Sequence, residues 1–123
     1  MEALLMFFKK IFHKNLPTDR KILEVIYEEY YDEFIKYNKD KEIRQTKNYV
    51  PIDILHISEK LKTDKDIIFA RLYYYFKPKY SYKDHNGKYV YLFNKKLGNE
   101  KHCIHFPYSA SILAKLRKKD YKI

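Results

Sequence analysis

The sequence predicts an α+β domain in which helices precede a three-stranded antiparallel sheet and one helix follows it. Up to about Phe76, apolar residues recur at the spacing of helices. Beyond Pro78 they alternate with polar residues, which is the period of a strand. The Asn86-Gly87 pair lies inside this alternating region and is typical of a tight hairpin turn. The length of 123 residues favours a single domain.

The first predicted element is an amphipathic helix within residues 1–16. Its apolar side chains share one side at helical spacing, and they are Leu4, Leu5, Phe8, Ile11 and Phe12. We expect this face to dock on the core or in a dimer interface. Flanking lysines make contact with a membrane surface the alternative, but a helix this short would bind a membrane only weakly.

A second helix is expected over residues 18–39, with Thr18 or Asp19 as its cap. The predicted buried stripe consists of Leu23, Ile26, Tyr27, Tyr30, Phe34 and Tyr37. The carboxylates Glu24, Glu28, Glu29, Asp32 and Glu33 are expected to face water. Neighbouring carboxylates can act as general acid and base. On an open helical face we interpret them as a solvated side.

The middle of the chain predicts a short extended segment, a compact helix and a longer helix. Residues 49–52 include Pro51, which restricts the residue before it to extended conformations. Asp53 opens a helix that ends at Leu61, and Asp64 is a suitable cap for a helix over residues 65–76. In that last helix we expect Ile68, Leu72 and either Tyr75 or Phe76 to point inward.

The remaining residues predict three strands and a closing helix. The strands are expected over residues 79–83, 88–94 and 101–106, with Tyr89, Tyr91 and Phe93 on one face of the second. Pro107 is expected to end the sheet. A helix then follows over residues 108–120, with Ser109 or Ser111 as its cap.

The net charge is concentrated at one end of the chain. Residues 77–123 hold 12 Lys and Arg against 3 Asp and Glu, a balance of +9, whereas residues 1–76 have a balance of +1. A field of this kind attracts polyanions, which points to nucleic acid or another anionic surface as the partner.

Part of the chain resembles the winged helix-turn-helix superfamily. The stretch Ile57-Ser58-Glu59-Lys60-Leu61 and then Asp64, Ile68 and Leu72 are similar in spacing to the helix–turn–helix core of that fold. The resemblance covers about residues 49–106, with further helices before this core. It implies duplex DNA binding, with the second helix in the major groove and the hairpin near the backbone.

The helix that would read bases departs from that pattern. Its expected outer positions hold Lys65 and Arg71 but otherwise mainly apolar and aromatic residues. Base edges are read by hydrogen-bonding side chains, and Asp64 and Asp66 would meet an approaching phosphate with negative charge. We therefore expect backbone contact of low sequence specificity.

The predicted sheet offers another surface, because lysines alternate there with tyrosines. Aromatic rings that stack on bases beside lysines that meet phosphates suit contact with single strands or with a backbone. An amphipathic meander, with one tyrosine face in the core and lysines that solvate its edges, explains the same pattern. The predicted contacts to nucleic acid are Lys65, Arg71, Lys77, Lys79, Lys83, Lys88, Lys95, Lys96, Lys101, Lys118 and Lys119.

Two other functions fit the sequence. One is a protein adaptor or a subunit domain, whose interface would consist of Leu4, Phe8, Phe12, Phe69 and Tyr73. The other is a small nuclease or toxin that uses Asp64, Lys65 and Asp66, although a helix cap and first turn explain these residues better. We favour a non-enzymatic protein with no catalytic residues and no cofactor.

The cysteine and histidine pattern does not predict a metal site. On a strand only Cys103 and His105 share a face, whereas zinc takes four ligands. Cys103 is the single cysteine, which favours a reducing cytoplasm, and the longest apolar run, residues 3–8, is far shorter than the ~20 residues of a membrane span. We expect a cytoplasmic protein without membrane contact.

Overall fold

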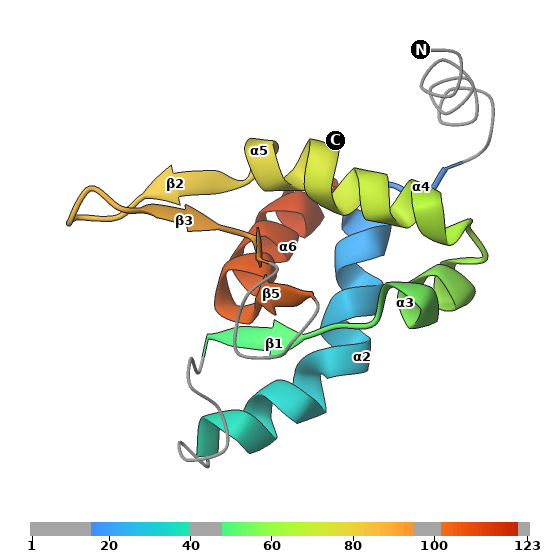
Figure 1. Ribbon diagram of the computed structural model, residues 1–123, viewed down its shortest axis with the longest axis horizontal. Helices are drawn as coiled ribbons and strands as arrows, with labels where there is room; N and C mark the ends of the chain where they lie inside the picture. Colours follow the sequence, from blue (N-terminus) through green and yellow to red (C-terminus); the bar gives the residue numbers. More distant parts are fainter. Residues whose placement is uncertain (1–15, 40–47, 95–101, 121–123) are drawn as a thin grey trace.

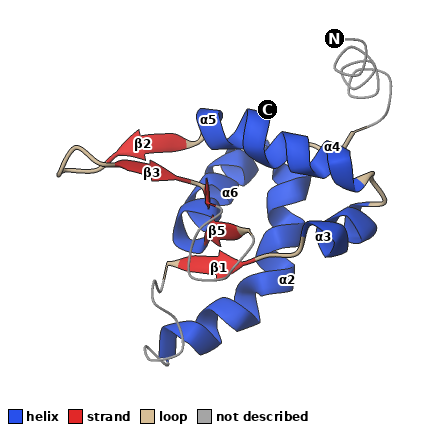
Figure 2. Cartoon of the chain, viewed as in Figure 1, coloured by secondary structure: helices blue, strands red, loops and turns tan. Residues whose placement is uncertain are grey.

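The computed structural model describes residues 16–39, 48–94 and 102–120, which form an α+β domain of helices and small antiparallel sheets (Figure 1, Figure 2). The helix predicted within residues 1–16 lies outside these ranges. Among the described helices, none has both the length and the apolar character needed to cross a membrane. The elements are α2 (Asp19–Lys39), β1 (Tyr49–Pro51), α3 (Ile54–Leu61), α4 (Lys65–Ala70), η1 (Arg71–Phe76), α5 (Lys77–Lys79), β2 (Ser81–Lys83), β3 (Tyr89–Tyr91), β4 (Phe93–Asn94), β5 (Cys103–His105) and α6 (Phe106–Asp120).

Helix α2 begins at the predicted position, but its acidic side chains do not all face water as expected. Thr18 caps the helix by accepting a hydrogen bond from the Lys21 N–H at 3.1 Å. Glu24 forms ion pairs with Arg20 and with Arg117 of α6, at 2.9 Å and 3.3 Å. Because α6 packs along α2, part of the expected solvated face lies between two helices.

Glu29 shows the same departure on the side of α2 that meets α3. Its Oε1 lies 2.8 Å from His56 Nε2 and 3.4 Å from Lys60 Nζ. The hydrogen bond with His56 lowers the pKa of the Glu29 carboxyl. These contacts link helices far apart in sequence, which helical periodicity alone does not reveal.

Helix α3 and the start of α4 follow the prediction. Asp53 accepts hydrogen bonds from the Leu55 and His56 N–H groups, and Asp64 accepts one from the Asp66 N–H. Both aspartates therefore act as the expected N-caps.

Residues 65–79 form one continuous helix, which we call the long helix, made of α4, the π-helical turn η1 and α5. A π-turn adds a residue to the helical period, so the side chains after it face different directions from those of an unbroken α-helix. Phe76 is fully buried and Tyr75 is exposed, which decides between the two predicted core residues. Ile67, expected on the outside, is buried.

The long helix continues past Pro78, where the sequence predicts a change to strand. Pro78 lies in the short segment α5, and the Tyr80 N–H donates to the Phe76 carbonyl at 2.7 Å to end the helix. As a result Lys77 and Lys79 are helical, and the strand predicted over residues 79–83 begins only at Ser81.

The strand predicted over residues 88–94 is divided between two sheets. Strand β3 pairs with β2 in a separate hairpin, whereas β4 joins a three-stranded sheet in the order β1-β5-β4. Leu92 and Phe93 are both fully buried, and consecutive residues of a regular strand cannot face the same core. The chain therefore bends at Leu92, and Phe93 does not share a face with Tyr89 and Tyr91.

The hairpin turn also differs from the expected type. A two-residue Asn-Gly turn requires positive φ at both residues. Gly87 has φ of +80°, but among the described non-glycine residues only Lys62 has a positive φ, so Asn86 does not. Asp84 stabilises the turn instead, because its carboxylate accepts hydrogen bonds from the Asn86 and Lys88 N–H groups.

Helix α6 begins at Phe106, earlier than predicted, and neither Ser109 nor Ser111 caps it. Ser109 lies within the helix, where its hydroxyl donates to the Phe106 carbonyl at 2.7 Å. Pro107 fits the first turn of a helix because no N–H is needed there. The strand β5 thus ends at His105 and the helix follows directly, with Pro107 in its first turn.

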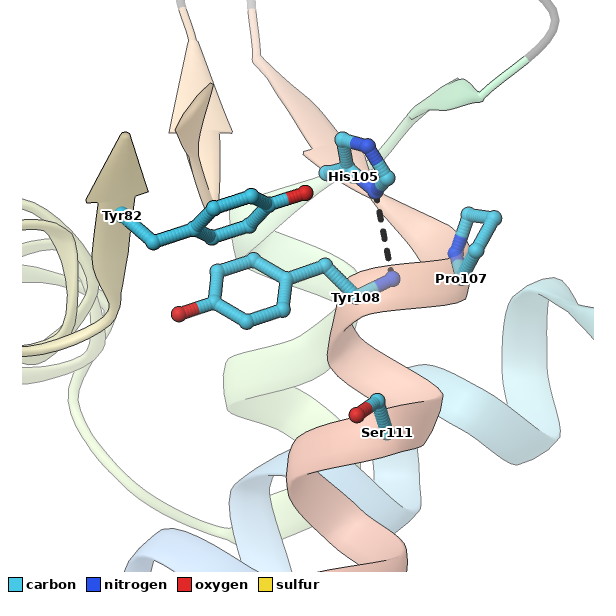
Figure 3. Close-up of a pocket in the computed structure, with 5 residues that line it drawn as sticks. All are labelled: Tyr82, His105, Pro107, Tyr108 and Ser111. Carbon is cyan, nitrogen blue, oxygen red and sulfur yellow. Dashed lines mark hydrogen bonds between the residues drawn. The ribbon is translucent and has the colours of Figure 1, made fainter. Parts of the chain in front are cut away.

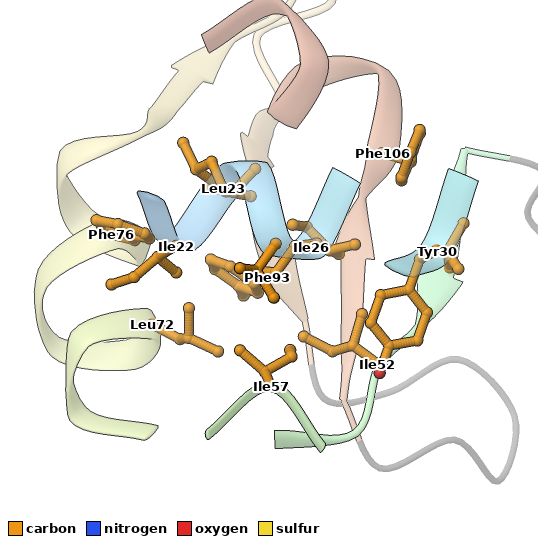
Figure 4. Packing of buried hydrophobic residues seen from close by; sticks show 14 of the residues in the cluster. Ile22, Leu23, Ile26, Tyr30, Ile52, Ile57, Leu72, Phe76, Phe93 and Phe106 are labelled. Carbon is orange, nitrogen blue, oxygen red and sulfur yellow. The ribbon is translucent and has the colours of Figure 1, made fainter. Parts of the chain in front are cut away.

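The core lies between α2, the long helix, α6 and the three-stranded sheet (Figure 4). Helix α2 contributes the most apolar side chains to it and contacts α6, α3 and β1. The largest fully buried side chains are Phe76, Phe93, Phe106, Ile22, Leu23, Ile26, Ile57, Ile67, Ile68, Leu72, Leu92 and Ile104. The β2–β3 hairpin extends away from this core (Figure 1).

Candidate nucleic-acid interface

The projecting β2–β3 hairpin has two faces that its register defines. Ser81 pairs with Tyr91, Tyr82 with Val90, and Lys83 with Tyr89. Residues opposite each other in an antiparallel pair share a face. We call the face of Ser81, Lys83, Tyr89 and Tyr91 the outward face, and the face of Tyr82 and Val90 the inward face.

The outward face presents two tyrosine rings and two lysines. Tyr89 and Tyr91 are 56% and 37% exposed, and their rings lie 6.1 Å apart at an interplanar angle of 23°. Lys83 Nζ is 5.2 Å from the centroid of the Tyr89 ring, and Lys77 Nζ is 5.3 Å from that of Tyr91. These distances suit cation–π contacts, which place the ammonium groups over the ring faces.

The inward face packs against the start of α6. The Tyr82 ring meets the Tyr108 ring edge-on, with centroids 4.9 Å apart at 78° (Figure 3). Together with His105, Pro107 and Ser111, these rings line a shallow open pocket of about 350 Å³. This contact fixes the direction of the hairpin relative to the domain.

His105 connects this pocket to the end of the sheet. Its Nδ1 accepts a hydrogen bond from the Tyr108 N–H at 3.1 Å (Figure 3). That N–H belongs to the first turn of α6, where it has no partner within the helix, so the imidazole acts as a cap. Burial lowers the pKa of His105 below its ordinary value of 6.5, which favours the neutral ring that accepts this bond.

A second group of basic and tyrosine residues surrounds Asp19. Arg71 Nη2 lies 2.6 Å from Asp19 Oδ1, and both Lys79 Nζ and Tyr80 Oη lie 3.1 Å from Oδ2. Arg71 is only 14% exposed and also donates to the Pro17 carbonyl at 3.0 Å. The hydrogen bond that Lys79 donates to Tyr75, with the contact to Asp19, raises the pKa of Lys79. We call these residues the Asp19 cluster.

The predicted nucleic-acid contacts therefore differ in their surroundings. Arg71 and Lys79 form ion pairs with the partly buried carboxylate of Asp19. Lys65, Lys88, Lys118 and Lys119 are exposed, with Lys65 on α4 and the last two at the end of α6. Lys95, Lys96 and Lys101 lie outside the described residues.

Only part of the predicted protein interface lies within the described residues. Leu4, Phe8 and Phe12 lie outside the described ranges. Phe69 and Tyr73 are half-buried on the long helix, with rings 4.8 Å apart, and both pack against the core. The adjacent Tyr74, which was not predicted as a contact, is 76% exposed.

Cys103 and His105 lie in β5, and His102 directly precedes this strand. Cys103 is buried. His102 Nδ1 lies 2.6 Å from Tyr73 Oη, in a hydrogen bond. Burial raises the pKa of Tyr73 to about 12. Within the ranges that the structure describes, no three His, Cys, Asp or Glu side chains gather closely enough to hold a metal ion.

Sequence reasoning did not foresee the Asp19 cluster or the contact between Tyr82 and Tyr108. Arg71 and Asp19 are separated by 52 residues, and no local pattern links them. The contact of Tyr82 with Tyr108 can be anticipated once the hairpin register is known. In that register Tyr82 lies on the opposite face of the hairpin from Tyr89 and Tyr91. Comparison of the chain with protein-family models, curated proteins and solved structures finds no match.

Proposed function

We propose that this chain is a non-enzymatic nucleic-acid-binding protein whose contact surface includes the β2–β3 hairpin and the basic end of α6. The observation that supports this most directly is the charge of the hairpin's outward face. Among the described residues, no carboxylate lies within ion-pair distance of Lys77 or Lys83, in contrast to Arg71 and Lys79. A phosphate could therefore approach these lysines without displacing an internal partner.

The winged-helix arrangement forms part of this proposal. Strand β1, helix α3, the long helix and the β4–β5 pair follow the order of that fold, and the β1-β5-β4 sheet is compatible with it. The β2–β3 hairpin is an addition between the long helix and β4. In this view it extends the basic surface beyond the helix–turn–helix core.

The proposed mode of binding is electrostatic rather than sequence-specific. Few groups that read base edges lie on the exposed side of the long helix, where Lys65, Asp66 and Tyr74 are found. Contacts to phosphate position a protein on nucleic acid but do not specify a sequence. DNA is the favoured partner on the winged-helix resemblance, with low specificity.

Salt dependence tests the proposal. With about four phosphate contacts, affinity for duplex DNA should fall roughly 100-fold when salt rises from about 50 to about 200 mM. Fluorescence anisotropy with labelled mixed-sequence DNA measures this. Replacement of Lys83 and Lys88 by Gln should weaken binding and reduce the slope of log K against log salt by about 2.

The matched control replaces Lys21 and Lys36 by Gln. These lysines are exposed on α2, so the net charge changes equally but the hairpin is untouched. Equal weakening by both double variants would exclude the hairpin as the contact surface. Binding that does not respond to salt would exclude the electrostatic proposal.

A protein contact is the second candidate function, and Tyr74 is the observation that favours it. Large aromatic side chains are enriched at protein interfaces, and this ring projects from the long helix beside Phe69 at 6.2 Å. An adaptor or subunit function predicts that Tyr74→Ser removes self-association or partner binding, as measured by sedimentation, while nucleic-acid binding persists.

A further inference from the structure

We propose that the outward face of the β2–β3 hairpin binds single-stranded nucleic acid, with unpaired bases stacked on Tyr89 and Tyr91. This inference rests on the proposed function and names the class of ligand that its site binds. It concerns base contact, whereas the proposed function concerns charge.

The two tyrosine rings of β3 form one exposed surface. Tyr89 and Tyr91 are two residues apart on β3, so they project from the same face. Their rings are within 23° of parallel, and both are more than one-third exposed. Tyr82, on the opposite face, is instead occupied by its contact with Tyr108. The pair therefore forms an aromatic platform on the side that does not dock on α6.

Two cations lie over these rings. Lys83 is opposite Tyr89 in the register, and Lys77 reaches Tyr91 from the end of the long helix. A base that stacks on either ring would replace the ammonium group over that ring, and the displaced lysine would remain close enough to contact a phosphate of the same strand. Stacking platforms flanked by positive charge are the usual means of binding single strands without sequence preference.

A duplex fits this face less well than a single strand does. Bases within a duplex are stacked on one another, so their faces are not available to a protein ring. A duplex could use Lys77 and Lys83 but not the tyrosine rings. The favourable contribution of the platform is therefore available only to unpaired bases, which makes the single strand the better ligand.

The test compares a thymidine oligomer of about 15 nucleotides with a duplex of the same length, using the full chain and fluorescence anisotropy. The variant Tyr89→Thr/Tyr91→Thr keeps strand propensity and a hydroxyl but removes both rings. The variant Tyr89→Phe/Tyr91→Phe keeps both rings. Tyr74→Thr removes a tyrosine that is still more exposed, at 76%, from the long helix and serves as the control.

We expect the wild type to bind the single strand more tightly than the duplex. The threonine pair should weaken single-strand binding by roughly tenfold or more and leave duplex binding nearly unchanged. The phenylalanine pair and Tyr74→Thr should both bind the single strand as the wild type does. Urea unfolding of each variant confirms that it is folded before its affinity is compared.

The other outcomes separate this inference from the proposed function. Salt-sensitive binding of both ligands with equal affinity, unaffected by the threonine pair, would overturn base stacking and leave electrostatic binding in place. The absence of binding to either ligand would overturn both. Loss of single-strand binding in Tyr74→Thr but not in the threonine pair would move the platform to the long helix.

Discussion

The Asp19 cluster and the outward face of the hairpin are built from the same residue types but differ in what holds their cations. In the cluster, Arg71 and Lys79 share the carboxylate of Asp19. At the outward face, Lys83 of the hairpin and Lys77 of α5 lie over tyrosine rings. Tyr75 and Tyr80 border the cluster as Tyr89 and Tyr91 border the hairpin lysines.

This difference distinguishes positive charge that stabilises the fold from positive charge that a ligand could contact. An ion pair largely removed from water links α2 to the long helix, so its basic members stabilise the fold. A cation–π contact at an exposed site is weak, and an arriving phosphate can replace it. Net charge by itself therefore overestimates the positive charge that is available to a ligand.

The largest expected effect is the loss of stability on neutralising Asp19. Asp19→Asn leaves Arg71 and Lys79 without their anion in a region where Arg71 is nearly buried. We expect the free energy of unfolding to fall by about 2 kcal/mol, less than for a fully buried pair because the cluster is partly exposed. Urea unfolding followed by far-ultraviolet circular dichroism measures this change.

The control is Asp32→Asn, which makes the same substitution at an exposed position of α2. It should change the free energy of unfolding by no more than about 0.5 kcal/mol. An equal effect of both substitutions would mean that the Asp19 cluster does not hold the two helices together.

The next effect is a loss of stability at low pH that arises from His105. Because burial lowers the pKa of His105 in the folded protein, the unfolded chain binds more protons as the pH falls below the ordinary value of 6.5. The contribution of His105 is complete above pH 6.5 and is lost as the pH falls through the lowered pKa, at no more than about 1.4 kcal/mol per pH unit.

His105→Asn isolates this contribution, because an asparagine side chain can accept a helix-capping bond but does not titrate in this range. Urea midpoints measured from pH 8 downward should decline more steeply for the wild type than for the variant, with His56, His85 and His102 present in both. If the urea midpoints of the two proteins declined in parallel, the pKa of His105 would be the same in the folded and unfolded states.

Local patterns in the sequence were sufficient to predict several elements. Caps at Asp53 and Asp64 and the bounds of α2 depend on neighbouring residues, and the structure confirms them. The π-turn could not be predicted in this way. Either Tyr75 or Phe76 satisfied the apolar spacing, and the choice depended on packing against Phe93, whose ring lies 6.4 Å from that of Phe76.

The candidate site was predictable in composition but not in arrangement. The alternation of polar and apolar residues predicted that tyrosines and lysines lie on strands. The structure confirms this for Tyr82, Lys83 and Tyr89. The contact with α6 and the bend at Leu92 depend on the tertiary fold. For the same reason, the sequence could not distinguish Lys79, which meets Asp19, from Lys83, which does not.

A smaller effect is expected from the contact that orients the hairpin. Tyr82→Ala removes the edge-on ring contact with Tyr108 and should lower the free energy of unfolding by about 1 kcal/mol. Tyr82→Phe keeps the ring and should change it little. Tyr89→Ala, on the outward face, should cost less than Tyr82→Ala in the same urea assay; the reverse order would mean that the two faces are assigned incorrectly.

The smallest expected effect on stability belongs to the lysines proposed to bind nucleic acid. Replacement of Lys83 and Lys88 by Gln should change the free energy of unfolding by no more than about 0.5 kcal/mol, since neither ammonium holds a carboxylate within the described part of the chain. Urea unfolding of this variant, beside Asp19→Asn, compares the two regions directly. A loss as large as that of Asp19→Asn would make the hairpin lysines structural. Retained stability with weakened binding would instead mean that charge on the hairpin is available to a ligand because the fold does not use it.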